Sequence, residues 1–332
     1  MNGASAARGA PPAGPEPAPF RVDLADGPEG GAAYWIRATD GLRLRVAHWP
    51  GGAKGTVLLF PGRTEYVEKY GRAAREFAAR GYGTAAIDWR GQGLADRLLD
   101  DRLSGHVALF RDYQLDVAAL LDWARVLRLP EPFMLAAHSM GGCIGLRALI
   151  EGLPVAAAAF SAPMWGIRIA PGLRPMAWTL SWGLRAVGLG HRYTPGTSAS
   201  SYVSASDFDV NLLTHDEEMF AYMARQIERC PDLALGGPST HWLSEALHET
   251  RLLNRIASPP VPALTLIGAE EAIVDADRVR ERMLRWPLGR IETVPGARHE
   301  VMMETPPRRR RFFDGAAALF DAHRPDRAAR SA

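Results

Sequence analysis

The chain has 332 residues, of which 47% are hydrophobic and 23% are charged, and its formal net charge at pH 7 is +2. This composition is typical of a globular protein with one large domain and an insertion, or with two domains. The small net charge gives no indication of nucleic-acid binding. The two isolated cysteines form neither a disulfide framework nor a metal site, and Cys143, on an apolar helical segment, is expected to be a buried free thiol.

The first residues of the chain are rich in Ala, Pro and Gly. They lack the basic segment and apolar core of a secretory signal, so we predict a disordered tail over residues 1–20. No apolar stretch reaches the ~18 residues of a membrane-spanning helix. The expected location is therefore the cytoplasm, with peripheral contact to a membrane as a further option.

Apolar and polar residues alternate over residues 34–50, which predicts antiparallel strands. Further along, short apolar runs alternate with segments of helical periodicity. This order predicts an α/β fold in which a mostly parallel sheet is covered by helices on both faces. Strands are expected at residues 56–60, 83–88, 133–138, 155–160, 263–267 and 290–294, and helices at 66–80, 109–127, 140–151, 276–285 and 309–323.

The alternation stops between residues 164 and 259, which hold several helical patterns and no clear strand. An insertion at this place would lie over the carboxyl ends of the strands, where open α/β sheets bind ligands. We therefore predict a core of residues 21–163 and 260–325, and a helical lid of residues 164–259.

Trp178 and Trp182 stand four residues apart in an apolar helical segment of the predicted lid, beside Arg185. Tryptophans next to a basic residue are typical of helices at an interface between water and lipid. We expect them to contact an acyl chain or a membrane surface, and the alternative is packing of the helix on its own domain.

The turn at Ser139 is the most informative part of the chain. The apolar run at 133–138 leads into the serine, and a helical segment follows, which is the strand–turn–helix context of a nucleophile elbow. The positions two before and two after it are small, Ala137 and Gly141. This pattern predicts that Ser139 is the nucleophile of an acyl hydrolase, activated by a histidine and a carboxylate.

In this architecture the acid and then the histidine follow the serine, each in a loop after a core strand. His299 closely follows the strand predicted at 290–294 and is the expected base. Three carboxylates follow the strand predicted at 263–267: Glu271 is the preferred acid, and Asp275 and Glu270 are the alternatives. His138, beside the nucleophile, is expected to be structural.

Other motifs accompany the Ser139 elbow, at residues 60–66 (Phe-Pro-Gly-Arg-Thr-Glu-Tyr), 69–70 (Lys-Tyr), 88–93 (Asp-Trp-Arg-Gly-Gln-Gly), 268–271 (Gly-Ala-Glu-Glu) and 299–300 (His-Glu). With them, roughly residues 33–320 resemble the bacterial lysophospholipase branch of the α/β-hydrolases. This branch is similar to monoacylglycerol lipases and to the serine aminopeptidase S33 grouping.

The resemblance implies a glutamate as the acid, which favours Glu271. It also implies an oxyanion hole made by the backbone N–H groups of Arg63 and Met140. The side chain of Arg63 is not needed for that role, and we expect it to form a surface ion pair, with an anionic head group as the alternative partner.

The reaction that the resemblance implies is hydrolysis of a lipid carboxylic ester, of a lysophospholipid or a monoacylglycerol, through an acyl-enzyme. The expected partner is this small-molecule lipid, and no nucleic acid, metal or other cofactor is expected, because near matches to phosphate loops and zinc helices lack the required spacing. One alternative is a catalytically silent binding module. Another is an aminopeptidase, which would need an acidic lid residue for the substrate amine: Asp207, Asp209, Asp216, Glu217 and Glu218 are available.

Overall fold

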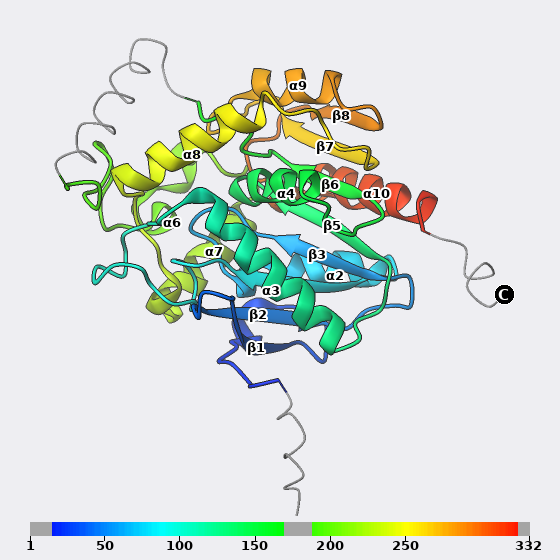
Figure 1. The fold of residues 1–332 in the computed structure, drawn as a ribbon, viewed down its shortest axis with the longest axis horizontal. Helices are drawn as coiled ribbons and strands as arrows, with labels where there is room; N and C mark the ends of the chain where they lie inside the picture. The colour runs from blue at the N-terminus through cyan, green and yellow to red at the C-terminus, as the bar shows by residue number, and fades with distance from the viewer. Residues whose placement is uncertain (1–14, 169–187, 325–332) are drawn as a thin grey trace, which may run out of the picture.

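The computed structural model describes residues 15–168 and 188–324. Within them an eight-stranded sheet has the order β1-β2-β4-β3-β5-β6-β7-β8 (Figure 1). The pairs β1–β2 and β2–β4 are antiparallel, and every pair from β4 to β8 is parallel. The strands are β1 (Ala32–Arg37), β2 (Arg43–Trp49), β3 (Thr56–Phe60), β4 (Gly83–Asp88), β5 (Phe133–His138), β6 (Ala158–Ser161), β7 (Ala263–Gly268) and β8 (Gly289–Val294).

Helices cover both faces of the sheet, because side chains of the buried strands alternate between two apolar cores. In β3, Leu58 and Phe60 join a cluster with α3, α4, α8 and α9, whereas Val57 and Leu59 join one with α2 and α10. The α-helices are α1 (Val22–Ala25), α2 (Gly71–Ala79), α3 (Tyr113–Val126), α4 (Met140–Ile150), α6 (Tyr202–Ala205), α7 (Glu217–Arg229), α8 (Thr240–Leu253), α9 (Ala276–Leu284) and α10 (Pro306–Ala322), and the 3₁₀ turns are η1 (Val67–Tyr70), η2 (Phe110–Asp112), η4 (Phe208–Val210), η5 (Pro231–Leu233) and η6 (Val301–Met303).

The prediction of a mostly parallel sheet covered on both faces is confirmed. The predicted tail is wrong for its last residues. Ala18 donates a backbone hydrogen bond to Ala33 at 2.9 Å, and Trp35 donates one to Glu16 at 2.8 Å, while the Phe20 ring packs edge-on against Trp49. This segment therefore satisfies backbone groups that β1 would otherwise leave open at the sheet edge.

The insertion between β6 and β7 holds α6, α7 and α8 in its described part. α7 is tied to the start of the chain, because Tyr222 Oη donates to the carbonyls of Ala25 and Glu68. α8 differs from the rest, since Trp242 and Ala246 belong to the main core cluster together with α3 and α4. We therefore propose that the core includes α8 and that the lid ends before this helix, earlier than residue 259.

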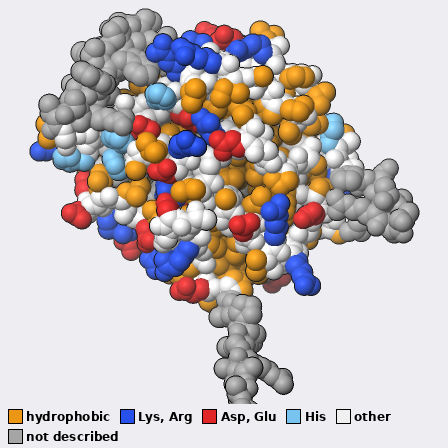
Figure 2. Space-filling view, viewed as in Figure 1, with side chains coloured by type: hydrophobic (Ala, Val, Ile, Leu, Met, Phe, Trp, Pro, Cys, Tyr) orange, Lys and Arg blue, Asp and Glu red, His pale blue; other side chains and the backbone are white. Residues whose placement is uncertain are grey.

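Among the described residues, no helix combines the length and the apolar character that crossing a bilayer requires. On the face shown in Figure 2, basic and acidic side chains are interspersed with apolar ones. That mixture agrees with the small net charge of the chain.

Candidate active site

Ser139 lies in a sharp turn between β5 and α4, with φ 48° and ψ −117°. A positive φ is unfavourable for serine, and such strain persists only where the surroundings fix it. The Ser139 carbonyl accepts hydrogen bonds from the N–H groups of Gly142 and Met164, at 2.9 and 2.8 Å. A Cβ on Gly141 would overlap the carbonyl oxygen of Phe60. The small residue two positions after the serine therefore lets α4 begin directly against the end of β3.

His299 and Glu271 form a buried hydrogen-bonded pair behind this turn. Nδ1 of His299 lies 2.7 Å from Oε2 of Glu271, and both residues are less than one-tenth exposed. Because an ionised carboxylate only accepts hydrogen bonds, Nδ1 carries the proton and Nε2 of a neutral ring is left as a base. The loops after β7 and β8 meet closely, since Glu270 N–H donates to the Ala297 carbonyl at 2.9 Å.

The ionised form of Glu271 is stabilised by its neighbours. Burial is the largest influence and by itself raises the pKa of the carboxyl. The charge and hydrogen bond of His299 and the N–H groups of Ile273 and Val274 outweigh it and leave the pKa below its usual value. The carboxylate can therefore hold the imidazole in one orientation across the neutral pH range.

The two alternative acids have other partners. Oε2 of Glu270 lies 2.8 Å from Nε2 of His215, and the Asp275 side chain caps α9 by accepting from the N–H of Arg278. Of the three carboxylates in this loop, Glu271 is thus the one that the structure places on His299.

Ser139 and His299 line the same cavity of about 310 Å³. Its apolar wall comes largely from the insertion, with Tyr202, Val203, Leu212, Leu213, Met223 and Ile227. The pocket is therefore polar at the candidate nucleophile and apolar beyond it, as binding pockets for small molecules commonly are.

The two predicted oxyanion donors lie beside this serine in sequence or in space. Met140 follows Ser139 and opens α4, and Arg63, in the loop after β3, lines the same cavity as Ser139. Neither backbone N–H donates a hydrogen bond to another described residue. Both groups therefore remain candidate donors for an oxyanion.

The expectation of a surface ion pair for the Arg63 side chain is wrong within the part of the chain that the structure describes. Its Nη1 donates to the Gly236 carbonyl at 2.9 Å, and its guanidinium lies 5.6 Å from the centre of the Trp242 ring. Burial lowers the pKa of Arg63 to about 10. Glu65, the acid two positions further along the chain, is bound by Lys69.

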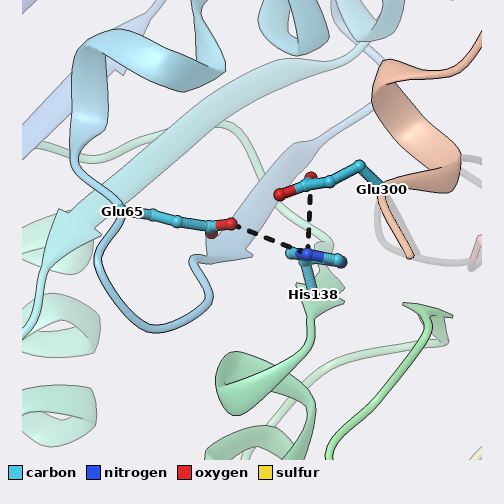
Figure 3. A group of neighbouring side chains, drawn as sticks. All are labelled: Glu65, His138 and Glu300. Atoms are coloured by element: carbon cyan, nitrogen blue, oxygen red, sulfur yellow. Dashed lines mark ion pairs between the residues drawn. The ribbon is translucent and has the colours of Figure 1, made fainter. Parts of the chain in front are cut away.

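A buried charged cluster next to the site was not predicted from sequence. Figure 3 shows three of its members, Glu65, His138 and Glu300. Lys69 Nζ lies 2.6 Å from Glu65 and 2.5 Å from Glu300, and Nε2 of His138 lies 3.3 Å from Glu300. Tyr70 Oη donates a hydrogen bond to Glu65. Glu65 and Lys69 fall one helical turn apart in the chain, a spacing that signals an ion pair, but nothing in the sequence places Glu300 beside them.

The donor set Glu65, His138 and Glu300 has the spacing of a metal site. The ammonium group of Lys69 already supplies the positive charge between the two carboxylates. We therefore interpret the cluster as a buried salt bridge rather than as a metal centre.

Three further residues were singled out from the sequence, and none of them lines this cavity in the described part of the chain. Cys143 is a buried free thiol, as expected. Trp178 and Trp182 fall outside the described residues.

Comparisons with known proteins agree with this architecture. A family model described as "Serine aminopeptidase, S33" matches residues 51–306. Lysophospholipase L2 of Escherichia coli (strain K12) is 32% identical over 295 residues, which cover 85% of this chain and 84% of the relative. The probable lysophospholipase L2 of Haemophilus influenzae is 29% identical over 251 residues, covering 75% of this chain and 78% of that protein.

Among solved structures, a soluble variant of monoglyceride lipase from Saccharomyces cerevisiae, in complex with a substrate analogue, superposes with a TM-score of 0.68 at 20% identity. The superposition covers 88% of this chain and 95% of the yeast chain. At that identity the likeness shows the fold, which is the α/β-hydrolase fold. The chain belongs to the serine aminopeptidase S33 family of α/β-hydrolases.

Proposed function

We propose that this chain hydrolyses carboxylic esters of lipids, lysophospholipids or monoacylglycerols, through an acyl-enzyme formed on Ser139. The observation that carries the proposal is the 2.7 Å contact between His299 Nδ1 and Glu271. The His299 ring lines the same cavity as Ser139, which has a strained backbone. A serine, an imidazole and a buried carboxylate in this order are the components of nucleophilic acyl transfer.

In the first half of the reaction, Ser139 Oγ attacks the ester carbonyl carbon while Nε2 of His299 takes the hydroxyl proton. The carbonyl oxygen becomes an oxyanion, which we assign to the N–H groups of Arg63 and Met140. Each donor of this kind contributes about 2.7–4 kcal/mol to transition-state stabilisation. When the intermediate collapses, the C–O bond to the alcohol breaks and the His299 imidazolium protonates the departing alcohol.

In the second half, His299 removes a proton from a water molecule that attacks the acyl-serine. The tetrahedral intermediate collapses to release the fatty acid, and the proton returns to Ser139 Oγ. Glu271 remains ionised throughout, because its role is to hold Nδ1–H and to stabilise the imidazolium that forms twice in each cycle.

The substrate class rests on two observations. The cavity wall beyond Ser139 is formed by apolar side chains of the insertion, which suits an alkyl chain rather than a charged group. The curated relatives above are lysophospholipases by name. We further propose peripheral contact with the lipid phase, since the substrate partitions into membranes and micelles.

An aminopeptidase activity has less support. Recognition of a free amine requires an unsatisfied acidic group in the pocket. Within residues 15–168 and 188–324, the two carboxylates that line this cavity, Glu65 and Glu300, already bind Lys69. Of the lid acids considered above, Asp216 pairs with Arg309 and Glu218 pairs with Arg72.

A single rate panel tests the proposal. Lysophosphatidylcholine, monoacylglycerols, short p-nitrophenyl esters and aminoacyl amides are compared for wild type and Ser139→Ala. We expect hydrolysis of the lipid esters, slow or absent cleavage of the amides, and a loss of kcat on the order of 10⁶ in the variant.

A fluorophosphonate probe provides the second arm, because it should label wild type and leave Ser139→Ala unlabelled. Labelling that persists in the variant would mean that another residue is the nucleophile. A protein that neither reacts with the probe nor hydrolyses any ester would be a silent module of the same fold.

A further inference from the structure

We propose that His138 is a charged imidazolium whose positive charge acts on the neighbouring base, His299, and so sets the lower pH limit of the reaction. His138 is then a positioning residue, because it acts on the reaction only through His299. The inference rests on the proposed function above, and it goes beyond the triad and the oxyanion hole.

Both ring nitrogens of His138 face hydrogen-bond acceptors or negative charge. Nδ1 lies 3.0 Å from the carbonyl oxygen of Ser161, which can only accept, so Nδ1 carries a proton. Nε2 lies 3.3 Å from Glu300 and 3.6 Å from Glu65, as an ion pair rather than a well-directed hydrogen bond. An unprotonated Nε2 would leave a lone pair beside two carboxylates, and a proton there gives them a positive partner. We therefore infer a proton on each nitrogen.

The charge balance of the cluster leads to the same state. Two carboxylates, Glu65 and Glu300, share one ammonium group, that of Lys69, and all of these side chains are nearly inaccessible to water. A net negative charge buried in this way is strongly unfavourable, and a positive His138 removes it. Burial, the largest influence, lowers the pKa of His138, but Glu300 and Glu65 outweigh it and raise the pKa above its usual value.

The His138 ring reaches the candidate base directly. Its centroid lies 4.8 Å from that of His299, with the planes 55° apart. Among the described residues, three charged groups face His299: Glu271 in the loop after β7, Glu300 next to it in the chain, and His138 at the end of β5. The two acids attract positive charge on this ring, and the imidazolium repels it.

This opposition matters because only a neutral His299 can take the proton of Ser139. Two charges at this distance in a buried site interact strongly, so the effect is large enough to measure in a rate profile.

The test is the pH dependence of kcat/KM for a short p-nitrophenyl ester with wild type and His138→Asn. Asparagine keeps an N–H donor for the Ser161 carbonyl but carries no charge. We expect the acidic limb of the profile to move to higher pH by about one unit or more. His48→Asn, which changes a half-buried histidine on β2, is the matched control and should leave the limb in place. A His138→Asn enzyme that is slower at every pH, with an unmoved acidic limb, would overturn the proposal.

A second measurement needs neither turnover nor a folded variant. In ¹⁵N histidine NMR spectra of the wild-type protein, His138 is assigned through its contacts with the ring of His299. Two protonated ring nitrogens at pH 8 support the proposal, and a neutral ring at pH 8 overturns it. Because this spectrum is independent of catalysis, it separates a failure of this inference from a failure of the proposed ester hydrolysis.

Discussion

One carboxylate, that of Glu271, holds both its own loop and the His299 ring. Its Oε2 accepts from His299 Nδ1 at 2.7 Å, and its Oε1 accepts from the N–H groups of Ile273 and Val274 at 2.6 and 3.0 Å. The backbone donors fix the carboxylate plane, so the imidazole can bind it in only one orientation. The same donors keep the group ionised, which is the state that a partner of an imidazolium requires.

We predict that Glu271→Gln lowers kcat by about 10²–10⁴-fold while the fold is retained. A glutamine amide is neutral and could present its NH₂ group to Nδ1, which would favour the wrong tautomer of His299. Steady-state kinetics on a p-nitrophenyl ester measure the effect. Glu270→Gln is the matched control, because its partner is His215, and it should stay within a few-fold of wild type. Equal losses in the two variants would contradict the assignment of Glu271.

The pH dependence of stability should contain a contribution from His106. Its Nδ1 lies 2.8 Å from Ser239 Oγ, and its ring lies 5.1 Å from that of His241. Burial above all, and then the charges of His241 and His191, lower its pKa from 6.5 to about 4. Below pH 6.5 the unfolded chain therefore binds a proton that the folded chain does not, so the free energy of unfolding falls as the pH drops from 6.5 towards 4.

His106→Gln removes this titration. Urea unfolding at pH 7 and pH 5 should show a larger loss of stability for wild type than for the variant over that interval. If both proteins lose the same free energy of unfolding, His106 is not a source of the pH dependence.

The fold was predictable because its strands are buried on both faces and end at turn residues. β4 and β5 have the predicted bounds. All six residues of each strand are buried, and Gly or Pro lies near the strand ends. The order of serine, acid and histidine also follows from the sequence, because each of these residues lies in a loop after a core strand.

The charged cluster could not be predicted, because its members come from distant parts of the chain. Lys69 and Glu300 are separated by 231 positions, and their contact depends on how the loops after β3 and β8 fold over β5. The placement of residues 16–20 likewise depends on tertiary packing, since the backbone partners of Glu16 and Ala18 lie on β1 and the Pro19 carbonyl accepts from Arg45. Local propensity alone made that segment look disordered.

The close approach at Gly141 gives a further prediction. A Cβ at this position would overlap the carbonyl oxygen of Phe60 and lie 2.5 Å from that of Pro61. Gly141→Ala must therefore push α4 away from the loop that holds Arg63, so we expect at least a tenfold loss of kcat/KM and a lower Tm. Gly145→Ala, in the same helix, meets the flexible Leu135 side chain at 3.1 Å and should be much better tolerated. Wild-type activity and Tm in Gly141→Ala would show that the turn can accommodate a Cβ at this position.

Arg45 provides the strongest prediction for stability. Its side chain is fully buried, with Nε 2.7 Å from Asp88 and Nη2 2.7 Å from Glu68, and Nη1 donates to the Pro19 carbonyl at 2.8 Å. Arg45→Ala leaves two buried carboxylates without this partner and releases the segment before α1. We expect a loss of about 3–5 kcal/mol in the free energy of unfolding, measured by urea denaturation.

Arg43→Ala is the matched control, because Arg43 lies two residues away on the same strand. Its ion pair with Asp96, at 3.4 Å, is about 40% exposed on both sides, and exposed pairs contribute about 0–1 kcal/mol. Limited proteolysis should likewise cut the N-terminal segment faster in Arg45→Ala than in Arg43→Ala. Similar losses of stability in the two variants would mean that the ion pairs of Arg45 do not hold the N-terminal segment in place. The backbone pairing of residues 16–18 with β1 would then be sufficient to hold it.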